Sequence, residues 1–183
     1  MSTHLFTERF KVKDELYLYD TNGLKIKRLA DDFVGKMDIA ARSDQSWFFV
    51  TLSGFTTPST VARYDFKEPD EDKKWSVYRT TKLKGLDAAD FSAEQIWYNG
   101  KDGTKIPMFI VRHKSTPLDG SAPALQYGYG GFTISINPFF SVAFLTFLQH
   151  YHAVLAVPNI RGGGEFGEDW HQGGTRERKV CFL

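Results

Sequence analysis

Two glycine-rich motifs in the last third of the sequence have the composition of a reactive site. The first reads Tyr-Gly-Tyr-Gly-Gly-Phe at residues 127–132, and the second reads Asn-Ile-Arg-Gly-Gly-Gly-Glu-Phe-Gly at residues 159–167. Glycines let a backbone approach a substrate closely. No serine lies in the pattern G-x-S-x-G, which would present a nucleophile on a strand-to-helix turn. The sequence therefore predicts the oxyanion-binding part of an acyl-transfer site without its nucleophile.

The elements around these motifs follow the order strand, glycine loop, helix, strand. A short strand is expected at residues 124–127, an apolar helix at 141–151 and a continuously apolar strand at 153–157. A strand without polar alternation is typical of a sheet that is covered by helices on both faces. The fold class predicted here is α/β, specifically the start of an α/β-hydrolase sheet. The second motif would then lie at the carboxyl end of a strand, where open α/β sheets bind ligands.

The first part of the chain has a different pattern, that of antiparallel strands. Residues 16–19 and 24–29 alternate on either side of Asn22-Gly23, a strong hairpin signal. Four further strands are expected to form one antiparallel sheet, at residues 36–40, 47–52, 60–66 and 75–80. Because such a sheet leaves two edges and two faces uncovered, it is expected to be a β-propeller blade rather than a free-standing domain.

A change in composition near residues 84–87 divides the chain into two predicted domains. Residues 1–83 would be the C-terminal part of a propeller, and residues 84–183 would be the N-terminal part of a hydrolase domain. The second domain begins with another predicted hairpin, formed by residues 94–98 and 105–112 around an Asn-Gly-Lys-Asp-Gly turn.

The sequence argues against three other kinds of site. The run at residues 162–167 fits G-x-G-x-x-G, but its acidic neighbours would repel a pyrophosphate. His150 and His152 are two positions apart at a helix end and have no nearby cysteine or carboxylate to complete a metal site. His171 comes too early for a triad histidine, which follows the serine and the aspartate in hydrolases. We expect neither a metal nor an organic cofactor.

The composition limits the classes of binding partner and the cellular compartment that we expect for this protein. The 183 residues are 42% hydrophobic and 25% charged, with a net charge of +1. Mixed charges without a basic stripe or polybasic cluster argue against nucleic acid and membrane surfaces as partners. The single cysteine, Cys181, has no partner for an internal disulfide, and no apolar run could act as a leader or membrane span. The expected location is the cytoplasm.

Both motifs, in this order, resemble the prolyl oligopeptidase (prolyl endopeptidase) family of serine peptidases. The second motif continues as Gly-Glu-Asp-Trp-His at residues 167–171, as in that family, although Phe166 stands where the family has tyrosine. The run Lys-Asp-Gly-Thr-Lys-Ile-Pro-Met-Phe-Ile-Val at residues 101–111 also matches. The resemblance covers residues 12–179. Residues 1–83 look like the last blade of the family's propeller and a hairpin of the preceding blade.

The resemblance implies a role for two residues. Tyr129 would donate its hydroxyl to the oxyanion of the tetrahedral intermediate, and Phe132 would line the pocket for the substrate proline. The alternatives are a tyrosine that packs the loop and a phenylalanine in the core beneath it. The implied activity is serine-type cleavage of short peptides after proline by a monomeric parent protein.

The triad serine, aspartate and histidine are absent from this chain, so we expect an internal fragment that is inactive alone. Its uncovered strand edges predict poor solubility in isolation. One alternative is a non-catalytic fragment that binds peptides or proteins. Another is a different α/β-hydrolase, such as a dipeptidyl peptidase or an esterase.

Overall fold

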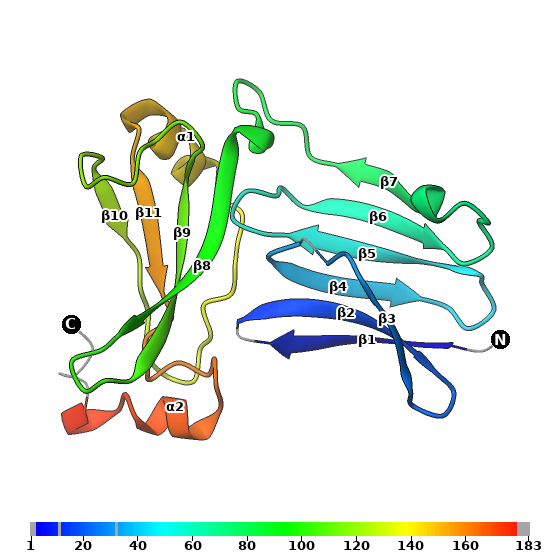
Figure 1. Cartoon of the computed structure of the whole chain (residues 1–183), viewed down its shortest axis with the longest axis horizontal. Coiled ribbons are helices and arrows are strands. Elements are labelled where there is room, and N and C mark those ends of the chain that lie inside the picture. The colour runs from blue at the N-terminus through cyan, green and yellow to red at the C-terminus, as the bar shows by residue number, and fades with distance from the viewer. Residues whose placement is uncertain (1–2, 11, 32, 179–183) are drawn as a thin grey trace. The chain divides into compact units, whose positions relative to one another are not determined.

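The computed structural model describes residues 3–10, 12–31 and 33–178, and the chain divides into two compact units. The first unit contains the residues up to Lys84 together with Pro138–Phe140, and the second contains Gly85–Asn137 and the residues from Ser141 onward. Strands make up most of the first unit, whereas the second combines strands with two α-helices (Figure 1). Cys181 lies outside the described residues.

The first unit consists of two antiparallel sheets. One has the order β1-β2-β3 and the other has the order β4-β5-β6-β7. The strands are β1 (Thr3–Phe10), β2 (Lys13–Asp20), β3 (Lys25–Leu29), β4 (Lys36–Ala41), β5 (Trp47–Ser53), β6 (Thr60–Asp65) and β7 (Trp75–Thr80). The four-stranded antiparallel sheet expected from the sequence is therefore confirmed. Strand β1 was not predicted, and it extends the predicted hairpin into a three-stranded sheet.

The predicted hairpin between β2 and β3 is confirmed, and its turn is held by Asp20. The Oδ1 atom of Asp20 accepts hydrogen bonds from the backbone N–H groups of Asn22 at 2.9 Å and Leu24 at 2.8 Å. Gly23 has a φ of +82°, a conformation that side chains disfavour. Local turn chemistry thus accounts for this hairpin.

One apolar cluster joins both sheets of the first unit. Its aromatic centre is Phe48, which is 1% exposed and whose ring centroid lies 5.3 Å from that of Tyr64 and 6.1 Å from that of Trp75. The buried members of the cluster are Leu16, Leu29, Met37, Phe48, Val50, Ala62 and Tyr64. Strand β7 contributes little to this core, because most of its residues are exposed at the edge of the sheet.

The second unit is built on a mixed sheet of order β10-β11-β9-β8. Its strands are β8 (Phe91–Asn99), β9 (Lys105–His113), β10 (Ala124–Gln126) and β11 (Val154–Pro158). The predicted hairpin is present as β8 and β9. Strand β11 is largely buried and pairs in parallel with β10, as expected for a strand-helix-strand unit, but its other neighbour, β9, is antiparallel.

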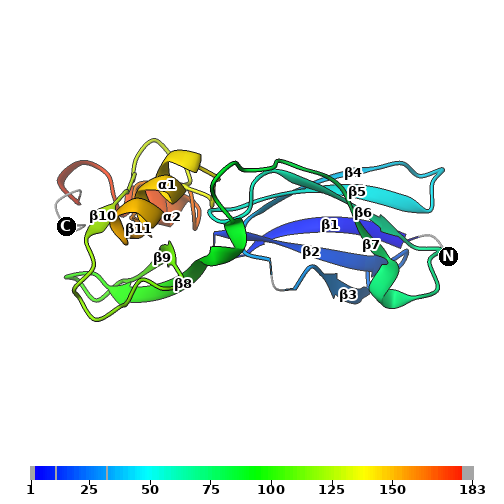
Figure 2. The same ribbon diagram turned by 90° about the horizontal axis from the view of Figure 1, so that it is seen from above.

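Helix α1 (Val142–Tyr151) covers one face of this sheet and connects β10 to β11. It begins at Ser141, whose Oγ accepts a hydrogen bond from the N–H of Phe144, and it ends at His152 with a φ of +49°. Leu145 and Leu148 are its buried residues, and the helix packs against β9 and β11. Figure 2 shows α1 on one side of β8 and β9. The predicted helix is thereby confirmed.

A second, five-residue helix, α2 (Glu168–Gln172), follows the loop after β11. Figure 1 shows it beyond the carboxyl end of β11. No element was predicted from the sequence for these residues. Within the described ranges, no helix is long and apolar enough to cross a membrane.

Candidate functional site

The first glycine motif lies in the segment after β10, residues 127–137, which we call the tyrosine loop. Its first residue continues the strand ladder, because the N–H of Tyr127 donates to the carbonyl of Ala156 at 2.9 Å. A tight turn follows, closed by a hydrogen bond of 3.0 Å from the N–H of Ile134 to the carbonyl of Gly131. The two central residues of this turn, Phe132 and Thr133, have φ values of +51° and +57°.

This turn holds Phe132 in an unfavourable conformation and presents it to solvent. A bulky residue at positive φ is an outlier that costs roughly 1–2 kcal/mol relative to the right-handed conformation. The side chain of Phe132 is 82% exposed. The described residues do not bury this side chain beneath the loop, and its predicted role in substrate binding stays a prediction.

Tyr129 lies on the same loop and is partly accessible. The residue is 38% exposed, which leaves one part of the ring packed and another part open. Within the described part of the chain, no hydrogen bond to its hydroxyl is found. A phenol in this state can donate a hydrogen bond to a bound ligand. Its predicted role in oxyanion binding stays a prediction.

The second glycine motif, residues 159–167, forms the loop after β11, which we call the glycine loop. It supports the tyrosine loop through direct backbone contact. A Cβ atom on Gly130 would lie 2.5 Å from the carbonyl oxygen of Arg161, and a Cβ atom on Gly162 would collide with the carbonyl oxygen of Gly130. Both positions therefore require glycine. The structure brings together the two motifs that the sequence separates by almost thirty residues.

Two buried polar residues of the glycine loop hold the far end of the tyrosine loop. Asn159 is fully buried, and its Nδ2 donates to the carbonyl of Ile136 at 2.7 Å. The Oε1 atom of Glu165 accepts from the N–H of Ile136 at 3.0 Å and from Nδ2 of Asn159 at 3.4 Å. Burial raises the pKa of the Glu165 carboxyl above its ordinary value, although these hydrogen bonds act in the opposite direction.

An ion pair fixes the glycine loop to the hairpin of β8 and β9. The guanidinium of Arg161 lies 2.6 Å from the carboxylate of Asp102, and the Arg161 side chain is only 13% exposed. The N–H of Thr104 and then the guanidinium lower the pKa of the Asp102 carboxyl. Because Asp102 occupies the turn between the two strands, the sheet and the glycine loop are joined by a charged contact.

The aromatic residues after the glycine run form a small cluster. Phe166 packs against Trp170, with ring centroids 4.8 Å apart, and against Trp97, with centroids 6.1 Å apart. Phe166 remains 39% exposed. The phenylalanine that stands in place of the family tyrosine therefore packs the start of α2 onto β8.

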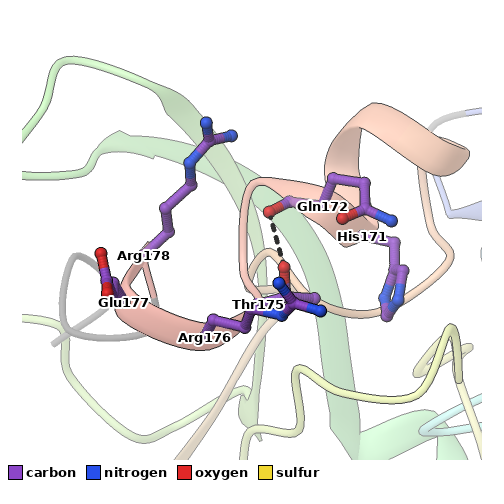
Figure 3. Close-up of a pocket in the computed structure, with 6 residues that line it drawn as sticks. All are labelled: His171, Gln172, Thr175, Arg176, Glu177 and Arg178. Atoms are coloured by element: carbon purple, nitrogen blue, oxygen red, sulfur yellow. Dashed lines mark hydrogen bonds between the residues drawn. The ribbon is translucent and has the colours of Figure 1, made fainter.

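His171 has a structural contact in this arrangement. Its Nδ1 atom lies 2.7 Å from the carbonyl oxygen of Gly162, so the ring is tied to the glycine loop. It also borders a hollow of about 630 Å³ (Figure 3). The lining residues are His171, Gln172, Thr175, Arg176, Glu177 and Arg178. Neither Tyr129 nor Phe132 lines this hollow.

The other sequence candidates do not form a site. His152 caps α1, and the ring of His150 contacts Tyr151. Among the described residues, no group of three histidine, cysteine or acidic side chains could hold a metal ion. The hydrogen bonds of Asn159 and Glu165 to Ile136 were not predicted from the sequence. The sequence did contain one indication of these contacts, because Glu165 lies within a run of glycines. Glycines have no side chains, so backbone groups are the main partners that such a run offers to a carboxylate.

Comparisons with known proteins identify extensive similarity along the chain. No family model matches. Prolyl oligopeptidase A of Galerina marginata is 62% identical over 172 residues, which are 93% of this chain and 23% of that protein. The dual function macrocyclase-peptidase POPB of the same organism is 63% identical over 169 residues, or 92% of this chain and 23% of that protein.

Solved structures give the same result. The apo structure of prolyl oligopeptidase B from Galerina marginata matches with a TM-score of 0.93 and 60% identity, and covers 98% of this chain and 25% of that one. The same protein bound to a 25mer macrocyclization substrate matches with a TM-score of 0.86 and 59% identity, at the same coverage. The chain thus spans about a quarter of the length of the proteins that it matches.

Proposed function

Because the chain belongs to the prolyl oligopeptidase family, we propose that it is the oxyanion-binding section of a serine peptidase that cleaves short peptides after proline. In this proposal, residues 84–183 begin an α/β-hydrolase domain, and residues 1–83 are the last blade and a preceding hairpin of a β-propeller. The serine, aspartate and histidine of the triad belong to parts of the full-length protein outside this chain.

The observation that carries the proposal is the state of Tyr129. The residue is 38% exposed, its hydroxyl lacks a hydrogen-bond partner among the described residues, and it follows a parallel strand at the edge where such sheets bind ligands. When a serine attacks the peptide carbonyl, the oxygen becomes negatively charged, and the phenol would donate a hydrogen bond to it. Loss of one such donor typically costs about 2.7–4 kcal/mol of transition-state stabilisation.

Phe132 supports the choice of proline as the residue before the cleaved bond. An exposed aromatic face close to Tyr129 in sequence can pack against the flat, apolar ring of a proline. The strained turn is consistent with this role, because strain concentrates where a ligand clamp requires it. Tyr129 would thus stabilise the transition state, and Phe132 would select substrates with proline before the cleaved bond.

The test uses a full-length protein that carries this sequence, assayed on a Gly-Pro amide and on the matched Gly-Ala amide. We expect hydrolysis of the proline substrate and little hydrolysis of the alanine substrate. Equal turnover of both, or of neither, would contradict the proposal. The isolated 183-residue chain is the matched control, and we expect no turnover from it because it lacks nucleophile and base.

A further inference from the structure

We propose that Glu165 is a positioning residue: together with Asn159 it fastens the far end of the tyrosine loop and thereby places the Tyr129 hydroxyl. This inference rests on the proposed role of Tyr129 in oxyanion binding. Glu165 itself would touch neither the substrate nor the reacting atoms. Its action passes through the backbone of Ile136.

Both backbone groups of Ile136 are held by the glycine loop. The Glu165 carboxylate accepts the Ile136 N–H at 3.0 Å, and the Asn159 amide donates to the Ile136 carbonyl at 2.7 Å. In a β-sheet, a neighbouring strand pairs with the backbone N–H and C=O of a residue in the same way, through one acceptor and one donor. Here two side chains, which also contact each other at 3.4 Å, replace that strand.

The tyrosine loop is anchored at both ends. Its near end is held by the bond from Tyr127 to Ala156. Between the ends lies the turn with positive φ at Phe132 and Thr133. Strained backbone persists only where its surroundings determine it, so release of the far end would let the turn relax. Tyr129 lies between the near anchor and this turn and would move with it.

Burial of Glu165 destabilises the fold, so a contribution to stability does not explain why a carboxyl holds this loop. The residue is 8% exposed, and its Oε2 atom has no hydrogen-bond partner among the described residues. A buried oxygen that no longer forms hydrogen bonds with water, and forms none with the protein, destabilises the fold. A hydrogen bond to a charged acceptor is nevertheless roughly twice as strong as a neutral one, although the bond to Ile136, at 3.0 Å, is of ordinary length. Placement of the loop accounts for this arrangement better than stability does.

The test is a double-mutant cycle in the full-length protein with a Gly-Pro amide as substrate. Glu165→Ala removes the anchor, and Tyr129→Phe removes the hydroxyl that the anchor places. We expect Glu165→Ala to lower kcat roughly ten- to a hundredfold in the parental protein, and much less in the Tyr129→Phe background. An equal fold loss in both backgrounds would overturn the proposal, as would a kcat within twofold of the parental value for Glu165→Ala.

Two further variants separate positioning from folding. Glu165→Gln keeps an acceptor of the same shape and should restore most of the activity that Glu165→Ala loses. Glu168→Ala removes an exposed carboxylate three residues away and should leave kcat unchanged. Failure of the Gln variant to recover any activity, or an equal loss from Glu168→Ala, would contradict the proposed anchor.

Hydrogen exchange provides a readout that does not depend on the proposed function. In Glu165→Ala, amides of residues 128–137 should exchange faster, while those of β9 and β11 keep their protection. Unchanged exchange in the tyrosine loop would overturn the proposal even if activity fell. If the parental protein hydrolyses no proline substrate, the proposed function fails, and the exchange experiment still decides whether Glu165 holds the loop.

Discussion

The backbones of Gly130 and Gly162 are in contact, so that a side chain on either residue would enter space held by the other segment. This contact unites two loops that follow different strands, β10 and β11. A glycine run can therefore serve a purpose other than binding a phosphate. In this chain it makes room for the backbone of the loop that carries Tyr129.

We expect Gly130→Ala to displace the tyrosine loop, because its Cβ would lie 2.5 Å from the carbonyl oxygen of Arg161. Overpacking of this kind costs typically about 1–3 kcal/mol. Gly128→Ala is the matched control in the same loop, since its Cβ would lie 3.4 Å from the Pro158 ring. Hydrogen exchange of residues 127–137 measures the effect. Equal protection in both variants would show that the close contact is unimportant.

Phe132→Gly should separate backbone strain from substrate binding. Glycine adopts positive φ without strain, so the substitution should relieve roughly 1–2 kcal/mol in the turn, and little packing is lost from a side chain that is 82% exposed. Under the proposed function, KM for a Gly-Pro amide should rise. Steady-state kinetics and thermal denaturation of the full-length protein test this pair of effects. An unchanged KM would remove Phe132 from the substrate site.

Glu165 should make the tyrosine loop less stable as the pH rises. Because burial raises its pKa in the folded state, the folded protein binds this proton more tightly than the unfolded chain does. The stabilisation is fully present below the ordinary value of 4.5 and is lost as the pH rises through the higher folded value. In Glu165→Gln the side chain does not titrate, so this pH dependence should be absent.

The measurement for this prediction is the opening free energy of the Ile136 amide, obtained from hydrogen exchange at several pH values. The parental protein should lose protection relative to Glu165→Gln as the pH increases from 4.5. A constant difference between the two proteins across that range would contradict the predicted sign.

The core of the first unit offers a test of stability alone. Phe48 is 1% exposed and contacts the rings of Tyr64 and Trp75, so Phe48→Ala should destabilise that unit by about 3–5 kcal/mol. Tyr78→Ala removes an aromatic side chain that is 71% exposed and should have a much smaller effect. Thermal denaturation compares the two variants. Similar losses would indicate that the assigned core is wrong.

Much of the fold could be predicted because local signals determine it. Asn22-Gly23 marks the hairpin, alternation of apolar and basic residues marks β3, and a continuous apolar run marks β11. Strand β1 escaped prediction because its place depends on pairing with β2, and α2 because five residues are too few for helical periodicity. Both omissions concern elements whose formation depends on context.

The candidate site was less predictable than the fold. The contact between Glu165 and Ile136 joins residues 29 positions apart, and no spacing in the sequence indicates it. The positive φ of Phe132 was also not foreseeable, since bulky residues rarely adopt it. These features arise from two loops packing together, which is a tertiary effect.

The most direct measurement is the kcat of Tyr129→Phe in the full-length protein on a Gly-Pro amide. The variant keeps the ring and removes only the hydroxyl. If this hydroxyl stabilises the oxyanion, kcat should fall about a hundred- to a thousandfold while KM changes little. A kcat close to the parental value would contradict the account, because the phenol would then take no part in the transition state.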